Sequence, residues 1–459
     1  MDNKKAWMEK LAHDAYVRGG FNGAWLYAEG GKIVSKGVLG YRDPANKEPL
    51  TEDTIFQLAS VSKQFTATAV MLCVRKGLLH LEDKLSAFFP ELTAYRDVTI
   101  RQLLSHTGGV PDYFDDEDWF LNIKKEENRV PGNDEIVRFL CETKLEPCFA
   151  PGEDLEYSNT GYNLLALLVE RLSGMPYEDF LRQNVFEPAG MKSTHACHIR
   201  RDGVPFANYA QATVLEDGKY VRDVDSLEDG DEVVALDGLN GDDYVYTTIA
   251  DMLTWDRVLR SGKVLTLEEQ MQMYTPQKLA SGENAVYDED EGLGYGFGWA
   301  TVRDDKYGLI VSHSGGMPGV STWFERFIDA DRTLVFFINR EAQDYRSIVG
   351  FWKGMRKVAH DETPDPIQSI EELTIQNPDK SKWADYCGHY EKNIEDFPLD
   401  EVYMKDGELY AHVVWDEDDT LDCKLYPLEE GVFGRKNGMV RITFGEDCLV
   451  IDDVTCKKV

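Results

Sequence analysis

The spacing of apolar residues changes along the chain between a helical period and the alternation of strands, and these changes outline the fold. Residues 4–18 carry apolar side chains at helical spacing and predict a short amphipathic helix. Two β-rich runs follow at residues 23–28 and 32–41, and the Gly30-Gly31 pair between them is typical of a hairpin turn. We therefore expect the chain to begin with a helix and a two-stranded hairpin.

The middle of the chain is mostly helical by the same criterion. A helix begins around Ser60 and buries the face that carries Phe65 and Leu72. It ends near Gly77, a residue suited to a helix C-cap. Residues 200–245 are rich in Asp and Gly with little periodicity, so we expect them to form an excursion or hairpin away from the core. Four further segments have helical spacing: residues 99–104, 134–142, 160–173 and 248–261.

Strand-like runs return between residues 294 and 338, and a helix at residues 345–359 follows them. Because strands lie near both chain ends and helices lie between them, we expect one antiparallel sheet assembled from both ends. The predicted fold class is α/β, an antiparallel sheet flanked by helices with a helical subdomain. The four strand-like runs are residues 294–299, 310–313, 323–328 and 333–338.

A charged, proline-containing segment at residues 361–366 marks a domain boundary. Beyond residue 386 nearly every run is strand-like, and turn signals such as Asp406-Gly407 separate the runs. This pattern predicts a small all-β domain, barrel-like or a sandwich. We expect a main domain at residues 1–362, a linker at 363–380 and a C-terminal β-domain at 381–459.

Charge is the unusual feature of the composition. The 459 residues include 49 Lys and Arg against 83 Asp and Glu, a net charge of −34. Such a chain repels phosphate and anionic lipid, so we expect neither nucleic acid nor a membrane as a partner. The longest apolar stretches have about 6 to 8 residues, whereas a bilayer span needs about 20. The N-terminal segment lacks the apolar core of a signal peptide, so we expect a cytoplasmic protein.

The eight cysteines are dispersed and form no CxxC pair, so we expect free thiols. His195, Cys197 and His198 lie close together in sequence, but no second ligand cluster has the spacing of a zinc site. We therefore predict no metal and no cofactor.

The first chemical signal is Ser60 followed three residues later by Lys63 at the start of a helix. Residues three apart lie on one helical face, about 5–6 Å apart at Cβ. A serine hydroxyl becomes a good nucleophile when a base removes its proton, and a lysine of lowered pKa can be that base. The pair predicts a nucleophile and its proton acceptor, although the two residues alone are a weak motif.

Two further signals come later in the chain. Tyr157 and Asn159 stand at the entry to a helix, where a phenol can relay a proton and an amide can orient a substrate or the lysine. His313, Gly315 and Gly316 end a predicted strand, where glycine lets a ligand approach the backbone and N–H groups can stabilise an oxyanion.

The order of these signals resembles the serine β-lactamase-like family, which holds class C β-lactamases, penicillin-binding D,D-peptidases, esterases and D-aminopeptidases. Neighbouring segments are similar too, and the resemblance covers roughly residues 10–360. The C-terminal domain resembles the lipocalin-like barrels of D-aminopeptidase-type members. The similar segments are residues 58–66, 103–109, 149–162, 187–194 and 295–299.

The resemblance implies a role for each matched residue. Ser60 is the expected acyl-forming nucleophile, Lys63 its proton shuttle and Tyr157 the general base. Asn159 is expected to orient the substrate. His313 takes the place of a lysine that many members have. Gly315 and Gly316 follow it, and the backbone N–H groups of Ser60 and Gly316 form the implied oxyanion hole.

One departure bears on substrate choice. A histidine is fully charged only below a pKa near 6.5, unlike lysine, so His313 weakens the case for recognition of a β-lactam carboxylate. A second departure is residues 241–246, whose bulk and charge reshape the expected pocket.

We predict a serine hydrolase that forms an acyl-enzyme on small esters or amides, with D-amino-acid peptides among the candidates. A β-lactamase or D,D-carboxypeptidase is the first alternative, and a non-catalytic binding protein on the same scaffold is the second. The expected partner is a small-molecule or short-peptide substrate, and an oligomer is left open.

Overall fold

The structure is a computed structural model in which the chain forms two compact units. These are Met1–Lys5 with Asn22–Glu341, and Ala6–Phe21 with Ala342–Val459. The domain limits expected from the sequence stay a prediction. The residues described are 2–43, 47–116, 118–216, 218–227, 230–288, 291–391, 394, 397–415, 420–436, 438–445, 447–451 and 454–459.

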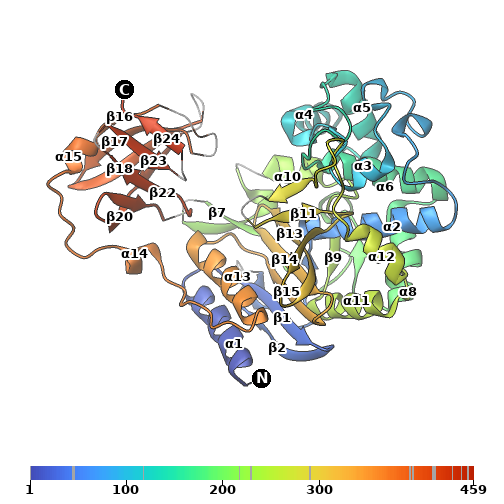
Figure 1. The fold of residues 1–459 in the computed structure, drawn as a ribbon, viewed down its shortest axis with the longest axis horizontal. Coiled ribbons are helices and arrows are strands. Elements are labelled where there is room, and N and C mark those ends of the chain that lie inside the picture. Colours follow the sequence, from blue (N-terminus) through green and yellow to red (C-terminus); the bar gives the residue numbers. More distant parts are fainter. Residues whose placement is uncertain are drawn as a thin grey trace. The chain divides into compact units, whose positions relative to one another are not determined.

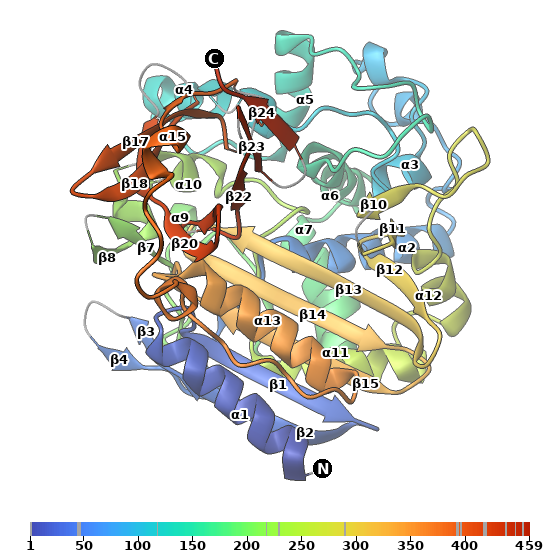
Figure 2. The same cartoon turned by 60° about the vertical axis from the view of Figure 1, so that its left-hand side comes forward.

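An antiparallel sheet of eight strands is the centre of the first unit, in the order β10-β11-β12-β13-β14-β15-β1-β2. The early hairpin pairs with the last strand of the sheet, with Gly23 opposite Ile338 and Glu29 opposite Arg332. Figure 2 shows the blue β1 and β2 alongside the orange β15. One sheet built from both ends of this region is therefore confirmed. Its strands are β1 Gly23–Glu29, β2 Lys32–Leu39, β10 Val286–Asp288, β11 Leu293–Tyr295, β12 Ala300–Asp304, β13 Gly308–Met317, β14 Val320–Phe327 and β15 Arg332–Ile338.

The predicted helices form, and two of them have clear caps. Thr99 and Gln102 make a reciprocal capping box at the start of α3, and Gly174 adopts the left-handed conformation that ends α6. Helix α2 packs against α6, and α11 packs against β15 and β1 of the sheet. In Figure 1 the helices α3, α5 and α6 gather apart from the β1–β2 edge. The helices are α2 Lys63–Arg75, α3 Ile100–Leu104, α4 Asp118–Glu127, α5 Asn133–Thr143, α6 Asn159–Ser173, α7 Tyr177–Leu181, α8 Glu187–Ala189, α11 Ile249–Ser261 and α12 Leu267–Met273.

The expectation for residues 200–245 is only half right. A hairpin of β7 (Thr213–Glu216) and β8 (Lys219–Arg222) does form there. From Ala235 to Ile249, however, every residue is buried, beginning at the end of α10 (Gly230–Leu236) and continuing through β9 (Val245–Thr247). Polar partners make this burial possible, because Asn163 donates to the backbone of Asn240 and to the carboxylate of Asp242.

The second unit carries an all-β region, as predicted. Strands β16–β19 form one antiparallel sheet and β20–β24 another, each in chain order. Between them lies a core that includes Trp383, Val402, Phe433 and Leu449. Within the described residues the two sheets remain separate and do not close a barrel. The strands are β16 Gly388–His389, β17 Leu399–Lys405, β18 Glu408–Val414, β19 Thr420–Lys424, β20 Tyr426–Glu429, β21 Val432–Gly434, β22 Arg441–Phe444, β23 Cys448–Ile451 and β24 Val454–Lys457.

Helices also belong to this unit. The greater part of α1 (Asp2–Val17) belongs to it, together with α13 (Tyr345–Ala359), where Gly354 leaves room for Leu11. The short helices α14 (Ile370–Leu373) and α15 (Trp383–Tyr386) precede the strands. Across the part of the chain that the structure describes, no helix is both long and apolar enough to cross a bilayer.

Candidate active site

The predicted nucleophile and its neighbour lie in two successive helical turns of different kinds. Ser60 is part of a 3-10 turn, η1 (Ala59–Ser62), and Lys63 is the first residue of α2. Side chains three apart are nearly eclipsed in a 3-10 turn, and Lys63 Nζ accordingly lies 3.0 Å from Ser60 Oγ. Ser60 is partly exposed, whereas Lys63 is completely buried. The hydroxyl is therefore open to a substrate while its amine neighbour is shielded from water.

Lys63 has two partners besides the serine. Its Nζ lies 2.7 Å from Asn159 Oδ1 and 3.1 Å from the backbone oxygen of Asp242. Burial lowers the pKa of Lys63, while the carboxylates of Asp242, Asp243 and Asp112 oppose that shift. A neutral amine can donate to Asn159 and Asp242 and direct its lone pair toward the Ser60 hydroxyl.

Tyr157 completes this group from the segment before α6. Lys63 Nζ lies 4.8 Å from the centroid of the Tyr157 ring. Burial raises the pKa of the phenol well above its ordinary value, and a hydrogen bond with Ser60 only partly opposes this. The phenol is thus neutral at ordinary pH. It is suited to donate or relay a proton, and it is not a phenolate before the reaction begins.

His106 holds the Tyr157 segment in place. Its backbone oxygen accepts from Glu156 N, and its Nδ1 accepts from Ser158 N, so both flanking amides are tied to one residue. The imidazole also lies against the Tyr157 ring, with centroids 4.3 Å apart. The buried Nε2 of His106 has no hydrogen-bond partner.

Asn159 links Lys63 to a carboxylate that the sequence analysis did not single out. Its Nδ2 donates to Asp112 Oδ2 at 3.0 Å, and its backbone N donates to the same oxygen at 2.6 Å. Burial raises the pKa of Asp112 to about 6, against the pull of these donors. The amide orientation is therefore set, with its oxygen toward Lys63 and its nitrogen toward Asp112.

Two more carboxylates enter from the polar buried segment. Asp242 accepts from Tyr113 OH at 3.0 Å and from Asn163 Nδ2 at 2.6 Å. Asp243 lies beside Gln57, 3.4 Å from its Nε2, and burial together with Asp242 raises the pKa of Asp243 to about 7. The segment therefore adds two carboxylates to the surroundings of Lys63.

His313 lies on β13, buried behind Tyr295. Its Nε2 lies 2.8 Å from the Tyr295 hydroxyl, and its Nδ1 lies 2.5 Å from Ser314 O. Burial, and then the charge of Lys63, lower the pKa of His313 to about 3. The imidazole is therefore neutral, with Nδ1–H donating to the carbonyl and Nε2 accepting from the phenol. The sequence alone indicated that His313 is charged only at acidic pH. With a pKa of about 3, it is not a cation at any physiological pH.

The two glycines of β13 face different surroundings. A Cβ on Gly315 would lie 2.4 Å from both Leu58 O and Thr322 Oγ1, whereas a Cβ on Gly316 would meet nothing within 4 Å. Gly315 thus allows β13 to approach the Ser60 turn closely. Gly316 borders open space, as the substrate side of an oxyanion site requires.

The structure brings all seven sequence-predicted residues into this region, and it adds others. Asp112 and the pair Asp242–Asp243 gave no periodic or motif signal for a role beside Lys63. Tyr295 could have been singled out, because it begins a glycine-rich run that the sequence analysis had matched to the family. No group of three potential metal ligands occurs within the described ranges.

Comparisons with known proteins show the family of this chain. A family model described as "Beta-lactamase" matches residues 8–348. The chain belongs to this family. It is 33% identical to Penicillin-binding protein 4* of Bacillus subtilis (strain 168) over 97% of this chain and 95% of that protein. It is 30% identical to a Beta-lactamase of Escherichia coli (strain K12) over 56% of this chain and 60% of that one.

Solved structures extend the likeness. The D-amino acid amidase from Ochrobactrum anthropi SV3 superposes with a TM-score of 0.59 and 25% identity, over 78% of this chain and 96% of that one. The octameric penicillin-binding protein homologue from Pyrococcus abyssi has a TM-score of 0.67 over 98% of this chain and 99% of that one. At 19% identity the latter shows the fold alone. Membership of the beta-lactamase family makes this protein a serine hydrolase, as predicted.

Proposed function

We propose that Ser60 is the nucleophile of an amidase or short-peptide hydrolase. The observation that carries this is the 3.0 Å approach of Lys63 Nζ to Ser60 Oγ, with Lys63 fully buried. Its lowered pKa favours a neutral amine, which can take the hydroxyl proton as Oγ bonds to the substrate carbonyl carbon. The carbonyl oxygen becomes an oxyanion that the N–H groups of Ser60 and Gly316 stabilise.

The neutral Tyr157 phenol fits the next step. As the carbon–nitrogen bond breaks, the leaving amine takes a proton from Tyr157, and Lys63 returns the serine proton to the phenol. Water then attacks the acyl-enzyme, gives up a proton to the same relay and releases the acid, which regenerates Ser60. Asn159 keeps Lys63 in position throughout through its 2.7 Å contact.

The charges around the site favour a substrate with a free amino group. Asp112, Asp242 and Asp243 surround Lys63, and His313 is neutral. A substrate carboxylate therefore meets no additional cation here, whereas an ammonium group meets carboxylates. This favours D-amino-acid amides or amino-terminal peptides over substrates whose recognition depends on a carboxylate.

A β-lactamase or D,D-carboxypeptidase activity is the second candidate. The observation in its favour is the 33% identity to Penicillin-binding protein 4* over almost the whole chain. The neutral His313 argues against it. Turnover of nitrocefin faster than of any amino-acid amide would favour this candidate.

Covalent labelling tests the nucleophile. A fluorophosphonate probe should label the wild-type protein and Ser62→Ala, and it should not label Ser60→Ala. Ser62 is a suitable control because it is two residues away and its Oγ accepts from Val245 N. Labelling that survives in Ser60→Ala would remove Ser60 from this role.

A substrate panel tests the amino-group preference. D-phenylalanine amide should be hydrolysed with a kcat/KM about tenfold or more above that of its N-acetyl derivative, a difference of about 1.4 kcal/mol. The L-enantiomer shows which stereochemistry the pocket accepts. Equal rates for the free and acetylated amides would contradict the preference without affecting the assignment of Ser60.

For the C-terminal region we propose the lipocalin-like domain that the sequence suggests, at residues 381–459 after a linker at 363–380. The chain-order meander of β16–β19 and β20–β24 supports it, since up-and-down barrels have this connectivity. Limited proteolysis should cut first within residues 363–380. First cleavage inside residues 388–457 would count against a stable domain there.

A further inference from the structure

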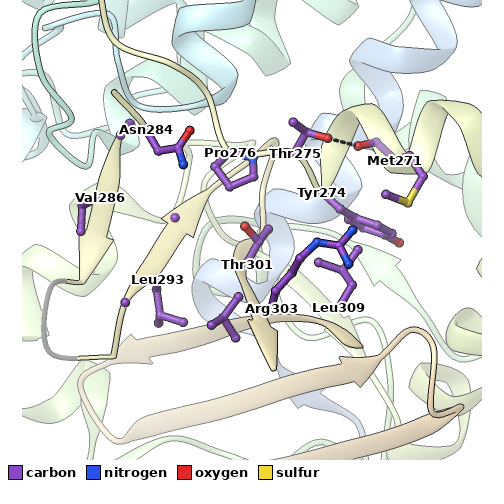
Figure 3. A pocket seen from close by; sticks show the side chains of 14 residues that line it. Met271, Tyr274, Thr275, Pro276, Asn284, Val286, Leu293, Thr301, Arg303 and Leu309 are labelled. Carbon is purple, nitrogen blue, oxygen red and sulfur yellow. Dashed lines mark hydrogen bonds between the residues drawn. The ribbon is translucent and has the colours of Figure 1, made fainter. Parts of the chain in front are cut away.

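A pocket of about 690 Å³ lies between α12 and the strands β10, β11 and β12. Figure 3 shows the side chains that line it, from α12 and the segment after it and from the strands. Its volume falls within the range of about 300–1,000 Å³ that is usual for ligand sites. Most of its lining is apolar, with Met271, Tyr274, Pro276, Val286, Leu293 and Leu309 among the contributing residues.

This pocket is separate from the candidate active site, although it uses the same strands. Val286 and Gly294 line it, while their neighbours Tyr287 and Tyr295 pack toward Tyr157. Successive residues of a strand point to opposite faces. Gly294 pairs with both Val286 and Thr301, so these lining positions lie on the reverse face of the strands from the tyrosines that border the active site.

A buried hydroxyl in the lining has no partner. Thr301 is only 3% exposed, and its Oγ1 makes no hydrogen bond. Figure 3 shows its side chain projecting from β12 toward Pro276. An unsatisfied buried hydroxyl is unfavourable, and a ligand with an acceptor oxygen would remove that cost.

A cation stands two residues further on the same strand. Arg303 lines the pocket, and no carboxylate among the described residues forms a salt bridge with it. Two residues apart on a strand, Thr301 and Arg303 project from the same face. An unpaired arginine is notable in a chain whose net charge is −34. Figure 3 shows its side chain extending toward Tyr274 and Met271.

We propose that this pocket binds a small amphipathic carboxylate, such as a medium-chain alkyl acid. Its carboxylate would pair with Arg303 and accept from the Thr301 hydroxyl, and its alkyl chain would cover Pro276 and Val286. An arginine suits a carboxylate because the guanidinium can donate two parallel hydrogen bonds. The apolar lining supplies the hydrophobic contribution to binding. An uncharged ligand would leave the arginine without a partner.

Calorimetric titration with octanoate tests the proposal on the full-length protein. One saturable site is expected, with equal affinity in the wild type and in Ser60→Ala, so the result does not depend on the proposed function. Arg303→Gln should weaken octanoate binding about tenfold or more and leave octan-1-ol binding unchanged. Arg96→Gln, another exposed arginine, should change neither. Acetate, which lacks the chain, should not bind measurably.

Thr301→Val gives a second readout that a folding defect cannot imitate. Because the hydroxyl has no partner in the free protein, the variant should melt at the same temperature as the wild type or higher. It should nevertheless bind octanoate more weakly. A lower melting temperature with unchanged affinity would contradict the assigned role of Thr301.

Three results would overturn the proposal. The first is the absence of saturable octanoate binding, and the second is binding to Arg303→Gln as tight as to the wild type. The third is displacement of octanoate when Ser60 is labelled with a fluorophosphonate, which would assign the binding to the active site. Retained binding in the labelled protein supports a separate pocket.

Discussion

The Tyr295 hydroxyl lies 2.8 Å from Nε2 of His313, and both side chains are buried. The pair fixes the neutral imidazole tautomer, because Nε2 must accept from the phenol while Nδ1 donates to Ser314 O. The position at which the family resemblance leads one to expect a lysine is thus an uncharged group here.

The first prediction concerns the titration of His313. Its pKa is lowered to about 3, so its ring signals should not shift between pH 5 and pH 8 in an NMR titration. Comparison with His313→Asn identifies the signals. Protonation favours the unfolded state, so this residue costs stability as the pH falls from about 6.5 toward 3. A midpoint near 6.5 for the folded protein would contradict the buried, neutral form.

The second prediction concerns Asp243, whose pKa is raised to about 7. The folded protein binds more protons than the unfolded chain between pH 3.8 and about 7, so stability falls as pH rises through that window. Asp243→Asn should therefore stabilise the protein at pH 8 by on the order of 1 to 4 kcal/mol, and by much less at pH 4.

Urea unfolding at the two pH values measures this difference. Asp305→Asn, at an exposed site, is the matched control and should change stability by less than about 0.5 kcal/mol at either pH. If Asp243 also binds the substrate ammonium, Asp243→Asn should reduce the preference for free over acetylated amides. A variant that is destabilised at pH 8 would show that the carboxylate is favourable where it lies.

The third prediction concerns Asn159, which connects Lys63 to Asp112. Asn159→Ala should lower kcat/KM about 10²-fold or more, because Lys63 loses one of the acceptors that hold it against Ser60. The rate of fluorophosphonate labelling should fall with it. Asn184→Ala is the control, since Asn184 contacts Lys76 at the far end of α2. Unchanged labelling in Asn159→Ala would show that Lys63 needs no such support.

The fourth prediction separates two adjacent glycines. Gly315→Ala should destabilise the protein by about 1–3 kcal/mol, since its Cβ would lie 2.4 Å from Leu58 O. Gly316→Ala should leave the melting temperature nearly unchanged, because its Cβ meets open space. It should still lower activity by crowding the proposed oxyanion site. Equal stability of the two variants in thermal unfolding would contradict the difference in packing.

Local signals in the sequence were reliable wherever the structure depends on neighbouring residues. The capping residue Thr99, the terminator Gly174 and the spacing of Ser60 and Lys63 each act within one or two helical turns. The segment 200–245 was misjudged in part because its Asp and Gly residues are typical of a surface loop. Its last residues are buried only because Asn133 and Asn163, far away in sequence, satisfy their polar groups.

By itself, then, the sequence determined the family, the sheet built from both ends of the region and the spacing that brings Lys63 beside Ser60. Only the tertiary structure decided that Asp112, Asp242 and Asp243 surround Lys63 and that His313 is neutral. The physical reason is that a pKa depends on desolvation and on charges within a few ångströms. Those groups come from segments that are distant along the chain and meet only when the core is packed.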